Sequence, residues 1–127
     1  MNEELDQLTN AIIGAAIAVH RELGPGLLES AYEACLAFEL TERGLQVERQ
    51  KPLPVAYRGI QLDCGYRLDL LIENKVILEL KTVDRLQPIH DAQLLSYLKV
   101  AQQKVGLLIN FHSLRVKDGI KRIVNKY

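Results

Sequence analysis

Cysteine is scarce in this chain of 127 residues, where only Cys35 and Cys64 occur. The two are not in a CxxC spacing, so neither a disulfide framework nor a zinc ribbon is expected. Long apolar runs are lacking as well. The longest, residues 11–19, has nine residues, whereas a membrane-spanning helix needs ~20. No contact with a membrane is therefore expected.

An excess of one charge is also missing, because sixteen Lys and Arg balance sixteen Asp and Glu. This balance excludes a protein that holds nucleic acid or an anionic membrane by bulk charge. A local basic strip stays possible, since residues 115–127 carry five basic residues and one acidic residue. The first six residues include three acidic residues and no basic one, where a secretion signal would be basic. A cytoplasmic location is the expectation.

The length suits a single domain, residues 1–127, and no repeat or low-complexity tract divides it. Apolar residues recur at steps of three and four between Leu5 and Leu23, which predicts an amphipathic helix. Asn2 is its expected N-cap, and the Gly24-Pro25-Gly26 segment is expected to end it.

A second helix is predicted over residues 28–43, with Gly44 at the position of a left-handed C-cap. The side chains expected to face the core are Leu28, Ala31, Cys35 and Phe38.

The remaining chain reads mainly as strands. Short strands are predicted at 47–50 and 54–58, a hairpin over 61–83 that turns at 73–75, and a strand at 105–111. A third helix is predicted over 89–103, and residues 115–127 are left as a basic tail. The expected fold is mixed α/β, with a small central sheet between the first two helices and the third.

The hairpin carries the most informative residues, Asp69, Glu79 and Lys81. A turn centred on Asn74 pairs residues whose numbers add up to 148, which sets Asp69 opposite Glu79 with Cβ atoms ~5 Å apart. Two carboxylates this close repel each other, and a hard divalent cation offsets that repulsion better than Lys81 alone. Glu79 also interrupts an apolar run typical of a buried strand.

Two alternatives remain open at this point. A two-residue Asn74-Lys75 loop would shift the register by one residue and place the two acids on opposite faces. The same residues could also form an exposed salt-bridged hairpin.

Asp69 followed by Glu79-x-Lys81 resembles the core motif of the PD-(D/E)XK nuclease superfamily. Gln93-Leu-Leu-Ser-Tyr97 resembles the QxxxY motif of its RecB-like members, and Gly26-Leu-Leu-Glu29-Ser-Ala-Tyr32 matches the motif of the GxxExxY protein family. The resemblance implies a restriction-endonuclease-like fold and a metal-dependent nuclease.

The resemblance also implies roles for individual residues. Asp69, Glu79 and the backbone carbonyl of Leu80 would hold Mg²⁺ or Mn²⁺, and Lys81 would assist the attacking water. Glu29 would be a third acid near the metal. Its alternative role is that of a first-turn acid favoured by the helix dipole.

Three further residues are candidates through the same resemblance. Gln93 and Tyr97 would contact substrate phosphate or hold Lys81, or else they are ordinary polar positions on a helix. Some RecB-type nucleases place a histidine from the region of His20 on the metal. The helical spacing of His20 from Ile13 and Ala16 favours a histidine at the edge of the core.

The expected activity is hydrolysis of DNA phosphodiester bonds. The alternative is a catalytically silent nuclease-fold module that binds nucleic acid or a protein partner. Because the chain is small and neutral, a homodimer or a partner protein is expected to help hold the substrate. An exposed edge strand would make dimerisation through the sheet plausible.

Overall fold

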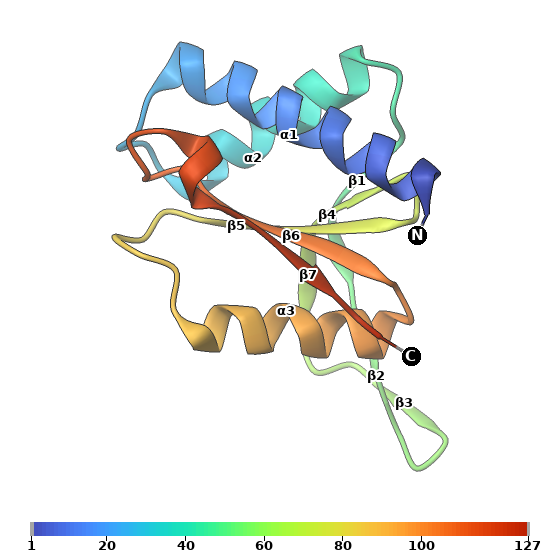
Figure 1. Ribbon diagram of the computed structural model, residues 1–127. Helices are drawn as coiled ribbons and strands as arrows, with labels where there is room; N and C mark the ends of the chain where they lie inside the picture. The colour runs from blue at the N-terminus through green and yellow to red at the C-terminus, as the bar shows by residue number, and fades with distance from the viewer. Residues whose placement is uncertain (1, 127) are drawn as a thin grey trace.

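The computed structural model describes residues 2–126, which form three layers (Figure 1). Helices α1 and α2 cover one face of a five-stranded sheet, and α3 covers the other. The elements are α1 (Glu3–Leu23), α2 (Glu29–Glu42), β1 (Val47–Pro52), β2 (Val55–Tyr57), β3 (Ile60–Leu62), β4 (Arg67–Ile72), β5 (Val76–Lys81), α3 (Pro88–Ala101), β6 (Val105–Asn110), the 3₁₀ helix η1 (Val116–Gly119) and β7 (Ile120–Val124). This arrangement confirms the mixed α/β fold with a central sheet flanked by helices.

The sheet has the order β1-β4-β5-β6-β7. Only β5 and β6 run parallel, and the connection between them is α3, as parallel pairing requires a crossover. The remaining strands, β2 and β3, form a separate hairpin that projects past α3 (Figure 1). Among residues 2–126, none of the helices has the length and apolarity needed to cross a membrane.

Helix α1 begins and ends where the sequence predicts. The Asn2 side chain accepts a hydrogen bond of 3.1 Å from the backbone N–H of Leu5, which satisfies one of the free donors of the first turn. Gly24 ends the helix with a φ of 70°, a conformation that glycine adopts without steric cost.

The buried face of α2 differs from the prediction. Leu28 is the N-cap and is 77% exposed, and Phe38 is 67% exposed. Ala31 and Cys35, the other two predicted residues, are half-buried, and Cys35 packs against the core. The fully buried side chains are those of Tyr32, Leu36 and Leu40. Both sets of residues recur at helical spacing, so the pattern alone does not choose between them. The choice is made by tertiary packing, because the Tyr32 ring stacks on Phe111 of the loop after β6, with centroids 4.5 Å apart.

Strand β7 falls in the segment that the sequence analysis left as a basic tail. It lies at the edge of the sheet beside β6, and only Ile123 among its five residues is buried. An edge strand with one buried side chain lacks the apolar alternation that marks a strand in sequence, which is why it was missed.

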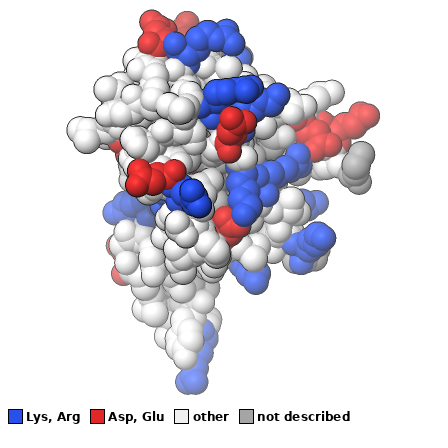
Figure 2. Space-filling model, turned by 60° about the vertical axis from the view of Figure 1, so that its left-hand side comes forward, with Lys and Arg blue, Asp and Glu red and all other residues white. Residues whose placement is uncertain are grey.

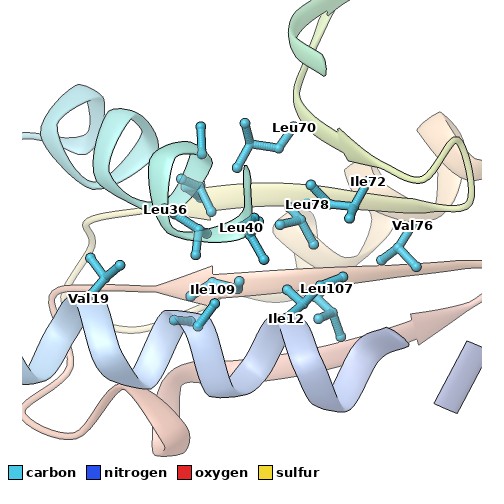
Figure 3. Packing of buried hydrophobic residues seen from close by; sticks show 14 of the residues in the cluster. Ile12, Val19, Leu36, Leu40, Leu70, Ile72, Val76, Leu78, Leu107 and Ile109 are labelled. Carbon is cyan, nitrogen blue, oxygen red and sulfur yellow. The ribbon is translucent and has the colours of Figure 1, made fainter. Parts of the chain in front are cut away.

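The hydrophobic core has one part on each side of the sheet. Figure 3 shows the larger part, where α1 and α2 direct apolar side chains toward β4, β5 and β6. Its labelled residues are Ile12, Val19, Leu36, Leu40, Leu70, Ile72, Val76, Leu78, Leu107 and Ile109. The smaller part lies beneath α3, where Leu94 and Leu98 pack on Leu71, Ile77 and Leu108. Together they hold the central strands from both faces.

Candidate active site

The β4–β5 hairpin has the register that places the two acids opposite each other. Leu70 pairs with Leu78, Leu71 with Ile77 and Ile72 with Val76. The turn includes Glu73 and Asn74, with φ values of 54° and 53°. The shift that a two-residue loop would have caused is therefore excluded.

Beyond this pairing, side chains take over the contacts between the two strands. The backbone N–H of Asp69 donates to Oε2 of Glu79 at 2.9 Å, and the backbone N–H of Leu80 donates to Oδ2 of Asp69 at 2.8 Å. Each carboxylate is thus fixed by the backbone of the opposite strand. The paired register of β4 and β5 ends at Leu70 and Leu78, and the acids lie directly beyond it.

The surroundings of Glu79 disfavour its charge. Glu79 is only 5% exposed. Burial, together with the charge of Asp69, raises the pKa of Glu79 to about 8, although the Asp69 N–H and Lys81 act in the opposite direction. Burial also raises the pKa of Asp69, against the lowering effect of the Leu80 N–H. Two neighbouring carboxylates with raised pKa values indicate a site that is short of positive charge.

A divalent cation fits this donor set. The hydrogen bonds from the backbone use Oε2 of Glu79 and Oδ2 of Asp69. For Oδ1 of Asp69, the donor found among residues 2–126 is the Gln50 amide, 3.5 Å away. No group of three or more His, Cys, Asp and Glu side chains suited to a metal occurs in the described part of the chain. Two carboxylates and a backbone carbonyl suffice for Mg²⁺, which keeps several water ligands.

Lys81 ends β5 and reaches toward α3. Its Nζ lies 3.5 Å from Oε1 of Gln93, and Nε2 of Gln93 donates to the Tyr97 hydroxyl at 3.2 Å. Gln93 and Tyr97 are one helical turn apart, so both face the same side of α3. The structure therefore brings these three candidate residues together in one row.

Glu29 approaches from the opposite layer, as the first residue of α2. Desolvation and the charge of Asp69 raise the pKa of Glu29, and the charge of Lys81 lowers it. Glu29 thus interacts electrostatically with two of the other candidate residues, Asp69 and Lys81.

Glu33 is a residue of this region that the sequence analysis missed. It is buried on α2 and accepts hydrogen bonds from Gln50 at 2.6 Å and from Arg49 at 3.2 Å. Because Gln50 also contacts Asp69, Glu33 is linked to the acid pair through one side chain. Its spacing of four residues from Glu29, on the same face of the helix, was the available signal.

Tyr32 and His20 hold the framework around the site. The Tyr32 hydroxyl donates to the Gly24 carbonyl at 2.5 Å and accepts from the Leu27 N–H at 3.1 Å, which braces the loop before Glu29. His20 is buried, and its Nε2 lies 2.8 Å from the Ser113 carbonyl. This contact ties α1 to the loop after β6, as expected of a histidine at the edge of the core.

Comparison with models of protein families finds a match over residues 6–123, nearly the whole chain, to the PD-(D/E)XK nuclease superfamily. The chain belongs to this superfamily. No curated protein and no solved structure matches it significantly. Superfamily membership agrees with the nuclease-type fold and suggests nucleic-acid binding, and members of this superfamily typically use divalent metals.

Proposed function

We propose that this protein is a metal-dependent nuclease that hydrolyses DNA phosphodiester bonds at the Asp69–Glu79 pair. The observation that carries the proposal is the opposition of these two carboxylates on β4 and β5, each anchored by a backbone N–H. A structural ion pair would need a matched cation between them, and Lys81 supplies only one positive charge for two acids.

Each side chain has a task in this reaction. Asp69, Glu79 and the carbonyl of Leu80 would hold Mg²⁺ or Mn²⁺, which lowers the pKa of bound water and offsets phosphate charge. Lys81 orients the attacking water and stabilises the negative charge of the transition state. Gln93 positions the Lys81 ammonium through its Oε1. Glu29 adds a carboxylate at the open side of the site, where it can accept a proton or order water.

The finer family assignment rests on two motifs. The RecB-like assignment is supported by the contact between Gln93 and Tyr97 beside Lys81. The GxxExxY assignment is supported by Glu29 near the acid pair and by the Tyr32 hydroxyl, which closes the loop in front of it. His20 would have only its Nδ1 for a metal, because its Nε2 contacts the Ser113 carbonyl.

The charge distribution supports the participation of a second protein chain in substrate binding. Figure 2 shows Lys and Arg interleaved with Asp and Glu on the face it presents. In the basic segment, Arg122 pairs with Asp6 at 2.9 Å and Lys121 pairs with Asp91. Paired cations contribute less to phosphate binding. We therefore include a homodimer or a partner protein in the proposal, acting in the cytoplasm, where the free Cys35 and Cys64 would stay reduced.

Cleavage of labelled single- and double-stranded DNA with Mg²⁺ or Mn²⁺ tests the proposal. We expect wild-type protein to cut and Glu79→Gln to lose at least a hundredfold in rate, because the substitution removes a proposed metal ligand. Glu42→Gln, an exposed glutamate at the far end of α2, is the matched control and should retain activity. Metal binding without cutting of any substrate would instead favour a silent binding module.

A further inference from the structure

A small cavity lies beside the acid pair, between α3 and the base of the β2–β3 hairpin. It has a volume of about 340 Å³, at the lower end of the range for small-ligand pockets. Its walls are Leu53, Val55, Tyr66, Gln93, Ser96, Tyr97 and Val100. Two parts of the chain that are distant in sequence therefore build it together.

Two tyrosines give the cavity an aromatic wall. The rings of Tyr66 and Tyr97 lie 5.8 Å apart between centroids and are tilted by 58°. Tyr66 is 46% exposed, and its carbonyl accepts a hydrogen bond of 2.9 Å from the Leu53 N–H, which fixes the rim. An exposed aromatic ring held in place by its backbone is suited to stacking against a flat ligand.

The cavity carries no charge, which limits what it can bind. None of its seven lining residues is Asp, Glu, Lys or Arg, whereas a phosphate pocket is expected to have Arg or Lys. The polar groups of the side chains are the Ser96 hydroxyl, the hydroxyls of Tyr66 and Tyr97, and the Gln93 amide, which already contacts Lys81 and Tyr97 and keeps a second N–H to donate. Aromatic faces with an amide and a hydroxyl match the chemistry of a neutral nucleobase.

Gln93 connects this cavity to the proposed reaction site. Its side chain lines the cavity and also contacts Nζ of Lys81 at 3.5 Å. In a nucleotide, base and phosphate are joined through a single sugar. A strand with its scissile phosphate beside Lys81 can therefore extend a neighbouring base toward Tyr66 and Tyr97.

We propose that this cavity binds one unpaired base of the substrate strand, so that the enzyme acts on single-stranded DNA or on frayed ends. The inference rests on the proposed nuclease function. In a duplex both faces of a base are covered by its stacked neighbours, so only an unpaired base can insert beside Tyr66. The projecting hairpin is largely uncharged except near its tip (Figure 2).

The test compares Tyr66→Ala with Tyr57→Ala, a matched exposed tyrosine on β2 that does not line the cavity. Cleavage of single-stranded DNA by Tyr66→Ala should show a KM about tenfold higher, in line with the loss of one stacked base. Tyr66→Phe should restore the wild-type KM, and Tyr57→Ala should not change it. An abasic nucleotide at one position near the cut should reproduce the loss with wild-type protein and have little further effect on Tyr66→Ala.

A binding readout separates this inference from the nuclease proposal. In a Lys81→Ala background with Mg²⁺, a single strand carrying a fluorescent base analogue should bind and be quenched by stacking, and Tyr66→Ala should weaken binding about tenfold. If Tyr66→Ala weakens binding in this way but wild-type protein cuts no DNA, the nuclease proposal is overturned and the base-pocket proposal is supported. Equal affinities and equal cleavage for Tyr66→Ala and Tyr57→Ala would overturn the base pocket, as would duplex cleavage as efficient as single-strand cleavage.

Discussion

At the residue scale, the defining feature is a carboxylate kept in a place that disfavours its charge. Glu79 lies in a strand that is buried along its length except at Lys81. Its pKa is raised above the value of about 4.5 that it has in an unfolded chain. A raised carboxyl pKa means that the folded state binds the proton more tightly than the unfolded state. Its contribution to stability is therefore largest below about pH 4.5 and is lost as the pH rises toward about 8.

The first prediction follows from the direction of this pKa shift. Glu79→Gln keeps the shape and an acceptor for the Asp69 N–H but removes the buried charge. At pH 8 and without metal, we expect the thermal midpoint of the variant to exceed that of wild type by roughly 5 °C. Scanning calorimetry from pH 5 to pH 8 measures the two thermal midpoints, and the difference between them should increase with pH. A variant less stable than wild type at pH 8 would contradict the prediction.

The second prediction concerns the metal. If Asp69 and Glu79 hold Mg²⁺ or Mn²⁺, the ion stabilises the native state by about 2.7 kcal/mol at a hundred times its Kd. The thermal midpoint of wild type should therefore rise with metal concentration, and that of Asp69→Asn should not. Glu42→Gln should rise like wild type. Equal shifts for Asp69→Asn and wild type would place the metal elsewhere.

At the element scale, the β4–β5 hairpin and α2 show what the sequence could and could not predict. The sequence left two hairpin registers open, and the structure has the one that is centred on Asn74 and sets Asp69 opposite Glu79. The prediction for the buried face of α2 was wrong for Leu28 and Phe38, which are exposed, because packing against Phe111 buries Tyr32 instead. Glu33 was missed although its spacing of four residues from Glu29 on one helix was a local signal. The Tyr66 wall was missed because it depends on contacts between segments far apart in the chain, which no local pattern records.

The third prediction tests the corrected face of α2. Leu36 is fully buried and Leu28 is 77% exposed. Leu36→Ala should lower the free energy of unfolding by about 2–5 kcal/mol through the cavity it leaves. Leu28→Ala should change it by no more than about 0.5 kcal/mol. Urea denaturation of both variants provides the measurement, and equal losses would mean that the face is assigned incorrectly.

At the scale of the whole molecule, the proposed site draws residues from all three layers. Glu29 comes from the α1–α2 layer, Asp69 and Glu79 from the sheet, and Gln93 and Tyr97 from α3. The superfamily match over residues 6–123 spans all five of them. The sequence motifs identified these positions, whereas their mutual contacts and the neighbouring base pocket required the structure.

The central claim is that this group of residues cuts DNA, and the most direct measurement is metal-dependent cleavage by Lys81→Ala. Lys99→Ala, an exposed lysine near the end of α3, is the matched control. We predict that Lys81→Ala keeps the stabilisation by Mg²⁺ and loses cleavage by at least a hundredfold, because its ammonium acts on the reaction and holds no metal. Lys99→Ala should cut like wild type. Cleavage that persists in purified Lys81→Ala at the wild-type rate would contradict the account.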